Sequence, residues 1–303
     1  MYLPAITIGY AIPGGNFDAL VHSVFQSAIN LRLNKRNRLI TVLASGEADL
    51  PQGIRLDAPR SFSFEGFQTG EPAICREGIL HFENTSLTIQ LHGARRWKCD
   101  LPALKADATN PAVAAAWSRV WDALNKRQIL SESAIVAEDL FRSGESARTG
   151  VSREAGEAMR DLINATRRYE SPDTSAVKSL IGLGPGLTPS GDDLLVGYMA
   201  GLWCTIRDKG ERAHFISRLG KTIIRRSGQT NDISRTYLYH ATQGQVSSRL
   251  ADLAEVICRR ENSERLLRIA ESAMQVGHTS GMDAVTGLLI GLATWIDSGT
   301  PCF

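Results

Sequence analysis

The sequence lacks a hydrophobic run long enough to cross a membrane. Its two longest apolar segments, Leu194–Ile206 and Ala284–Ile296, span about 13 residues each, whereas a membrane helix needs about 20. No basic residue precedes the first apolar stretch at the amino terminus, so we expect no signal peptide. These features predict a cytoplasmic protein in which both segments form buried helices.

Cysteine is scarce, and neither sign of charge is in excess. The five cysteines lie far apart without a Cys-x-x-Cys pair, which argues against a disulfide framework and a thiolate zinc site. A net charge of +2 gives no general drive towards nucleic acid or an anionic membrane, so we expect neither as a partner. Hydrophobic residues make up 43% of the 303 residues, enough for a sizeable core in roughly two domains.

The first third of the chain reads as one helix followed by short strands. Apolar residues at helical spacing predict a helix over Phe17–Leu33. Glu77-Gly78 separates two apolar runs and predicts a hairpin. The predicted strand segments are Leu39–Ala44, Ile54–Leu56, Ser61–Phe67, Ala73–Phe82 and Ser86–His92.

From about residue 107 onwards the signals are helical. Asn110-Pro111 is a typical helix start, with a capping side chain followed by proline at the first helical position. The expected fold is therefore α+β: a β-rich domain over 1–106, a small sheet or barrel with one helix, followed by an all-helical domain over 107–303. The helices are predicted over Ala112–Lys126, Ser131–Arg142, Ser152–Tyr169, Thr174–Ile181, Ser190–Arg207, Glu211–Ser227, Ile233–Thr242, Val246–Arg259, Ser263–Val276 and Ser280–Asp297.

Two of these helices begin with the same pattern. Ser190–Leu202 and Ser280–Leu292 both read S-G-x-D-x3-G-x3-G-L. A serine followed three residues later by an acid predicts a capping box, in which Asp193 and Asp283 reach back to the helix start. Glycines one turn apart leave a groove, so the two helices could pack together with their amino termini close. The starts are either caps alone or caps that also line a site.

A glycine-rich loop, Gly182–Asp193, leads into the first of these helices. Glycine allows the backbone to approach a ligand closely, and a helix start favours phosphate or carboxylate. The loop lacks the lysine of a P-loop, and no strand precedes it as in a dinucleotide fold. Its four glycines and two prolines favour a binding loop over a rigid turn.

Candidate catalytic groups stand at both helix starts. We expect Asp193 to be used in the cap and Asp192 to be free to accept from an amide NH2, to hold Mg2+ through water, or to act as a base. Before the second copy, His278 is expected to be neutral beside the helix amino terminus. It would then donate to a carbonyl or act as a base, or it would be structural. Asp283 completes the catalytic set.

A third polar cluster covers 229–235. Asn231 or Asp232 is expected to cap the next helix, and Arg235 is the best-placed cation for a carboxylate or phosphate. We interpret His22-Ser23 and Asn30, on the predicted first helix, as structural. The residues expected to bind substrate are Gly184, Gly186, Thr188, Ser190, Gly191, Asp193, Asn231, Arg235, Thr279, Ser280 and Gly281.

Several of these blocks resemble the AllH-like proteins. The similar blocks are Gly182–Asp193, Asn231–Ala241, Gly277–Asp283 and the segment from His22 through Asn30, so the resemblance covers nearly the whole chain. It implies a subunit of the oxamate carbamoyltransferase system of allantoin catabolism, working with an FdrA-like subunit and a second large subunit. The implied reaction converts oxalurate and phosphate into oxamate and carbamoyl phosphate. A paralogue would act on a related small amide or carboxylate.

Two other functions stay open beside the transferase. One is a stand-alone Mg2+-dependent hydrolase that uses Asp192, Asp193 and Asp283. The other is a non-catalytic scaffold for the partner subunits. We expect no cofactor for the transferase, and Mg2+ only for the hydrolase.

Overall fold

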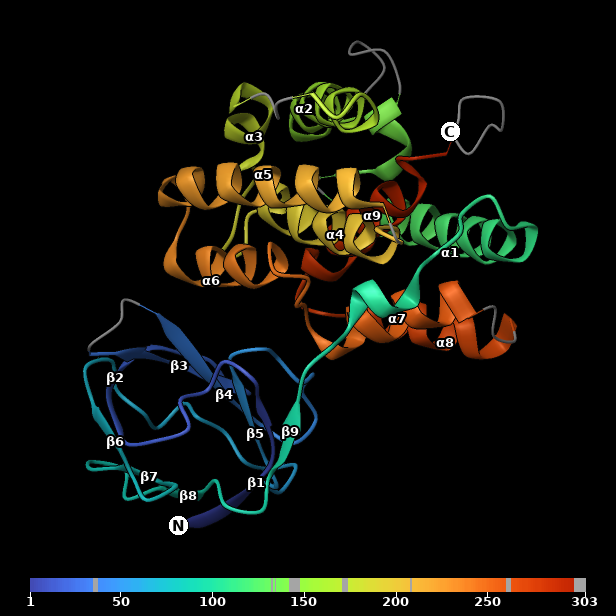
Figure 1. The fold of residues 1–303 in the computed structure, drawn as a ribbon. Coiled ribbons are helices and arrows are strands. Elements are labelled where there is room, and N and C mark those ends of the chain that lie inside the picture. Colours follow the sequence, from blue (N-terminus) through green and yellow to red (C-terminus); the bar gives the residue numbers. More distant parts are fainter. Residues whose placement is uncertain are drawn as a thin grey trace. The chain divides into compact units, whose positions relative to one another are not determined.

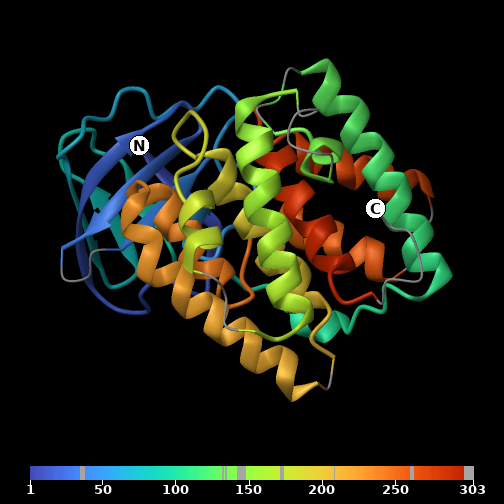
Figure 2. The same ribbon diagram turned by 90° about the horizontal axis from the view of Figure 1, so that it is seen from above.

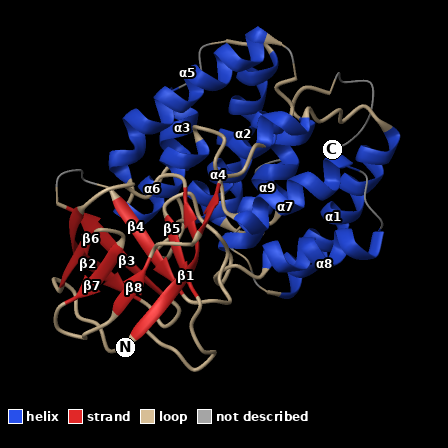
Figure 3. Cartoon of the chain, turned by 60° about the horizontal axis from the view of Figure 1, so that its bottom comes forward, coloured by secondary structure: helices blue, strands red, loops and turns tan. Residues whose placement is uncertain are grey.

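The chain forms two compact units, Met1–Cys99 and Asp100–Phe303. The computed structural model describes residues 1–34, 38–131, 133, 135–141, 148–170, 174–207, 209–259 and 263–296. Within these residues, the strands belong to the first unit and the helices to the second (Figure 3). The predicted α+β class is confirmed.

The first unit is a β-barrel. The strand order is β5-β4-β3-β2-β6-β7-β8-β1-β9, and a further pairing between β5 and β1 closes the sheet. Strand β9 adds to the far end of β1, in parallel with it. The strands are β1 (Tyr2–Gly9), β2 (Phe17–Val24), β3 (Ala28–Leu33), β4 (Leu39–Leu43), β5 (Gly53–Leu56), β6 (Pro72–Arg76), β7 (Ile79–Phe82), β8 (Thr88–Gln90) and β9 (Arg95–Trp97).

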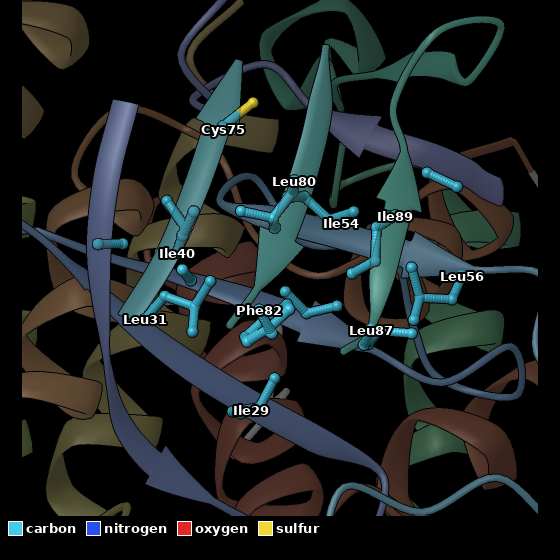
Figure 4. Close-up of a cluster of buried hydrophobic side chains, with 14 of the residues drawn as sticks. Ile29, Leu31, Ile40, Ile54, Leu56, Cys75, Leu80, Phe82, Leu87 and Ile89 are labelled. Carbon is cyan, nitrogen blue, oxygen red and sulfur yellow. The ribbon is translucent and has the colours of Figure 1, made fainter. Parts of the chain in front are cut away.

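Alternation of side chains along the strands fills the barrel. Ile29 and Leu31 on β3, Leu80 and Phe82 on β7, and Ile89 on β8 are fully buried. Figure 4 shows these side chains together in one hydrophobic cluster. Because residues two apart on a strand face the same side, each strand contributes two or three side chains to one core.

The predicted helix over Phe17–Leu33 is wrong, because this segment forms the antiparallel pair β2–β3. The spacing that suggested a helix ignored Val21 and Leu31, which are buried in alternation with Ala19 and Ile29. A period of two therefore describes the buried set better than 3.6. His22-Ser23 and Asn30 consequently lie on strands, where the Asn30 amide donates to the Ser23 hydroxyl at 3.0 Å.

Two other predictions for this unit had opposite outcomes. The hairpin at Glu77-Gly78 is confirmed: both residues have positive φ, and they join β6 to β7. The strand over Ser61–Phe67 is wrong, because this segment is a non-strand loop. Its aromatic residues close on one another instead, and the Phe62 and Phe64 rings meet edge to face at 4.8 Å.

The second unit is built around two central helices, α4 (Ser190–Cys204) and α9 (Ser280–Ala293). They lie side by side within this unit (Figure 1 and Figure 2). The other elements are η1 (Leu101–Leu104), α1 (Pro111–Leu130), η2 (Ala137–Phe141), α2 (Gly150–Arg167), α3 (Thr174–Leu180), α5 (Gly210–Arg226), η4 (Ser227–Gln229), α6 (Asp232–Ala241), α7 (Ser248–Arg259) and α8 (Ser263–Met274).

Most predicted helices are present, with ends shifted by a few residues. The start at Asn110-Pro111 is confirmed, because the Asn110 side chain accepts from Ala112 N–H. The predicted helix over Ser131–Arg142 is wrong: its described part holds only η2, and Arg142 lies outside the described residues. The side-chain amide oxygen of the buried Gln128 accepts from Ala137 N–H at 2.8 Å, so a side chain completes this turn.

Glycines bring α4 and α9 into backbone contact. A Cβ on Gly197 would lie 1.8 Å from the Ala284 carbonyl oxygen, and one on Gly287 would lie 2.0 Å from the Leu194 oxygen. The two contacts are equivalent in the repeated S-G-x-D-x3-G-x3-G-L pattern. Gly197 of α4 corresponds to Gly287 of α9, and Leu194 corresponds to Ala284. The helices therefore cross in a two-fold manner, and the predicted packing of the glycine grooves is confirmed.

Candidate functional site

The starts of α4 and α9 are not capping boxes. Pro189 and Thr279 occupy the N-cap positions, and neither makes a side-chain capping bond. Ser190 and Ser280 are the first helical residues, so the acids three residues on lie too far into the helix to reach back. The predicted caps are wrong, which releases both serines and both acids for other contacts.

The hydroxyl and carboxyl groups of the two starts are exchanged between the helices. Asp193 of α4 interacts with the hydroxyls of Ser280 and Thr188, whereas Asp283 of α9 interacts with those of Ser190 and Thr279. The Thr188 and Ser280 oxygens are 2.5 Å apart. We call these residues the acid–hydroxyl cluster: Thr188, Ser190, Asp193, Thr279, Ser280 and Asp283.

The carboxyls are the deeper part of this cluster. Asp283 is 0% exposed and Asp193 is 8% exposed, whereas Thr188, Thr279 and Ser280 are half-buried. Three carboxyl oxygens have no hydrogen-bond partner: Asp193 Oδ2 and both oxygens of Asp283. The hydroxyls of Ser190 and Thr279 are thus close enough to Asp283 to affect its pKa, but they do not meet the geometry of a hydrogen bond to it. Native proteins rarely leave buried polar atoms in this state.

Burial dominates the protonation of both acids. Desolvation raises the pKa of Asp283 to about 7, and the Ser190 and Thr279 hydroxyls offset only part of this effect. Desolvation also raises the pKa of Asp193 well above its usual range, and the negative charges of Asp283 and Asp192 raise it further. Burial therefore favours the protonated form of both carboxyls, and Asp283 is divided between its two forms near neutral pH.

Asp192 is a structural anchor rather than the free acid that we predicted. One of its oxygens accepts from Gly182 N–H at 2.9 Å, and the other accepts from the Thr230 hydroxyl at 2.5 Å. Burial is the largest effect on Asp192 and raises its pKa, against these two bonds. Asp192 is thus engaged at both oxygens, whereas the cap that was to use Asp193 does not form.

The glycine-rich loop is held at two points. Asp192 ties down Gly182, and the Asn231 amide donates to the Leu187 carbonyl at 2.8 Å. Between these ties, Gly184 and Gly186 have φ of 99° and 97°, a conformation that other residues rarely adopt. Asn231 also caps α6 by accepting from Ile233 N–H and Ser234 N–H, so its predicted capping role is confirmed.

Arg235, the predicted cation for an anion, and His278, a predicted catalytic residue, lie apart from the contacts of the cluster. Arg235 pairs with Asp232 at 3.1 Å and donates to the carbonyls of Ser227 and Thr230. It therefore fixes the turn that presents Thr230 to Asp192. His278 is exposed at the turn before α9.

The glycines at the two helix starts serve packing. Gly191 N–H donates to the Leu183 carbonyl and Gly281 N–H to the Val276 carbonyl, so both groups are already engaged. A Cβ on Gly191 would lie 2.0 Å from the Leu180 oxygen. The hydroxyls of Thr188, Ser190, Thr279 and Ser280 are the side-chain donors of this region.

The three aspartates do not form a metal site together. Across the described segments, no group of three or more His, Cys, Asp or Glu side chains is arranged to hold a metal ion. In the same part of the chain, no helix combines the length and apolar character needed to span a bilayer.

Sequence reasoning did not single out Thr230, which holds Asp192, or Met282, which stands at the equivalent position of α9. The Met282 sulfur accepts from the Ser131 and Ser133 hydroxyls at 3.6 and 3.7 Å. Both residues could have been found by asking what contacts the variable position of the repeated S-G-x-D pattern.

Comparison with known families covers both units of the chain. Residues 180–292, which contain the glycine-rich loop and the acid–hydroxyl cluster, match the family model described as oxamate carbamoyltransferase subunit AllH. Residues 5–96, which contain the barrel, match the AllH family N-terminal domain. No solved structure matches the chain. Two models of the same family thus match the barrel and the part of the chain that contains the site, and the chain belongs to the AllH family.

Proposed function

We propose that this protein is a carbamoyltransferase subunit of the oxamate type and that its acid–hydroxyl cluster binds the small substrate. The observation that carries this proposal is the convergence of two equivalent helix starts on buried carboxyl oxygens without partners. The family description supplies the reaction class. Convergent polar groups with shifted pKa values are typical of functional sites.

The reaction that the family description implies interconverts oxalurate plus phosphate with oxamate plus carbamoyl phosphate. The bond between the carbamoyl carbon and the oxamate nitrogen breaks, and a phosphate oxygen bonds to that carbon. The proton that phosphate loses must reach the nitrogen. Such a transfer depends mainly on positioning and on donors aimed at the developing oxyanion, so it requires no covalent enzyme intermediate.

The cluster offers groups suited to these tasks. The four hydroxyls of Thr188, Ser190, Thr279 and Ser280 can donate to substrate oxygens or accept from an amide. Burial favours the protonated form of Asp193, and Asp283 can give or take a proton near neutral pH. We infer that the FdrA-like subunit and the second large subunit complete the enzyme, in the cytoplasm.

The test is activity of the complete complex. Purified chain is combined with the FdrA-like and second large subunits, and phosphate release from oxamate and carbamoyl phosphate is measured. Ser280→Ala should lower kcat/KM by about tenfold or more, because it removes a donor from the cluster. Ser263→Ala is the matched control, since Ser263 is likewise the first residue of a helix, α8, but is exposed and outside the cluster.

The same assay separates catalysis from scaffolding. If omission of the chain abolishes activity while Ser280→Ala and Asp283→Asn complexes keep the wild-type rate, the chain is a scaffold and the proposal is wrong.

A further inference from the structure

The acid–hydroxyl cluster has a surplus of acceptors. Asp193 Oδ2, Asp283 Oδ1 and Asp283 Oδ2 are buried without a donor. A buried acceptor that has lost its water without gaining a partner costs about 1–3 kcal/mol. Three such atoms from two helices are therefore suited to a bound polar group, which can donate to a carboxylate and accept from a carboxylic acid.

The cluster also has no compensating positive charge. Burial, hydroxyls and neighbouring acids are the effects on the pKa values of Asp193 and Asp283, with no basic side chain of the described residues among them. Arg235, the cation that the sequence favoured for an anion, pairs with Asp232. A carboxylate or phosphate would meet two acids here without a cation, so the cluster favours a neutral group.

We propose that Asp193 and Asp283 bind the primary carboxamide end of the substrate, –CO–NH2, rather than its anionic end. Asp283 accepts from the NH2 group, and the protonated Asp193 donates to the carbonyl oxygen. This inference rests on the proposed function, because it assigns which end of an oxamate-like substrate enters the cluster.

The two acids are matched to these separate roles. A carboxamide presents two N–H donors and one carbonyl acceptor, so its ideal partner combines an acceptor with a donor. Burial raises the pKa of both carboxyls, and the negative charge of Asp283 raises the pKa of Asp193 further, so an ionised Asp283 favours a protonated Asp193. A carboxylate beside a carboxylic acid supplies the required combination.

The anionic end must then be bound by other groups. Two N–H groups of the helix starts, those of Gly191 and Gly281, do not serve it, because carbonyls already engage them. Positive charge for the carboxylate or phosphate would come from outside the cluster, and the partner subunits of the transferase are the source that we infer.

The test compares oxamate with pyruvate, which has the same charge and nearly the same shape but a methyl group in place of NH2. Binding to the complete complex is measured by calorimetry at pH 7. Oxamate should bind at least about tenfold more tightly than pyruvate, because a site built around N–H donors rejects the analogue that lacks them. Asp283→Asn should abolish this preference, whereas Asp161→Asn, at an exposed site on α2, should keep it.

Asp193→Asn provides a second variant should Asp283→Asn not fold, and it should also reduce the preference. Equal binding of oxamate and pyruvate, failure of the complex to bind oxamate, or a preference that survives both substitutions would overturn the inference. So would Asp283-dependent binding of K+ without discrimination between the two ligands, since that would identify a cation site. Transferase activity that still depends on Ser280 would leave the proposed function standing in each case.

Discussion

The starts of α4 and α9 have the same sequence pattern but different supports. At the variable position of S-G-x-D, α4 has Asp192 and α9 has Met282. Asp192 is held by Gly182 N–H and the Thr230 hydroxyl, and Met282 packs against Ser131 and Ser133. The shared serines and aspartates interact with the other helix start, whereas the variable position faces the helix's own surroundings.

This difference separates two tasks. The shared serines and aspartates build a cluster that needs both helices, so they can change only together. The variable residue anchors each start independently, through a polar tie in α4 and a largely apolar contact in α9. One start can thus carry the glycine-rich loop while the other does not.

The largest effect is expected from breaking the helix crossing. Gly197→Ala and Gly287→Ala should each lower the free energy of unfolding by about 3 kcal/mol or more, because the added Cβ meets a backbone oxygen at 2 Å or less. Chemical denaturation measures this loss. Gly210→Ala is the control, since a Cβ at this first residue of α5 meets nothing within 4 Å. A large loss at only one of the two equivalent glycines would contradict the two-fold packing.

The next effect concerns Asp283 and pH. Because its folded pKa of about 7 lies above the unfolded value of 3.8, the folded state holds a proton that the unfolded state releases, and stability falls as pH rises from 4 to 7. Asp283→Asn should therefore gain roughly 2–4 kcal/mol relative to wild type between pH 4.5 and pH 8. Urea unfolding at both pH values measures this gain, and Asp161→Asn should show none. A stability difference between Asp283→Asn and wild type that does not change with pH would show that the pKa of Asp283 is not raised.

The anchors of the two starts should differ in strength and in reach. Asp192→Ala removes two hydrogen bonds at a buried site and should lower stability by about 2 kcal/mol, with faster hydrogen exchange at Gly182 N–H. Met282→Leu keeps the volume and should lower stability by less than about 1.5 kcal/mol. Unchanged exchange at Gly182 in the Asp192 variant would contradict the anchoring role.

The smallest effect separates capping from loop attachment. Asn231→Ala should lower stability by about 1 kcal/mol and speed hydrogen exchange across 183–188, since it removes a cap and the bond to Leu187. Asn110→Ala removes only the cap of α1, so it should match the stability loss without affecting the loop. Equal loop exchange in both variants would show that the Leu187 bond does not restrain the loop.

The sequence predicted the fold class and the helix crossing because both depend on local patterns. Glycines one turn apart in two equivalent segments leave few ways to pack, and Asn110-Pro111 specifies a helix start by itself. The prediction of a helix over residues 17–33 was wrong because a few apolar residues there fit both the helical period of 3.6 and the strand period of two. Only the pairing of the strands distinguishes the two structures. Tertiary contacts decide such ambiguous segments.

The site was predicted in place but not in detail. The sequence indicated that the two starts would converge, yet it assigned Asp193 to a cap within its own helix. The choice between Asp192 and Asp193 depends on Thr230 and Gly182, which are distant in sequence from one another. No local rule predicts that Asp193 would instead interact with Ser280.

The most direct test of the account is a carbon-13 NMR titration of the Asp193 and Asp283 carboxyls. We predict that Asp283 titrates near pH 7, that the pKa of Asp193 is raised well above its usual range, and that Asp283→Asn lowers the pKa of Asp193 because it removes the neighbouring negative charge. If both carboxyls titrate near 3.8, independently of each other, the coupled acid pair does not exist and the proposed site is contradicted.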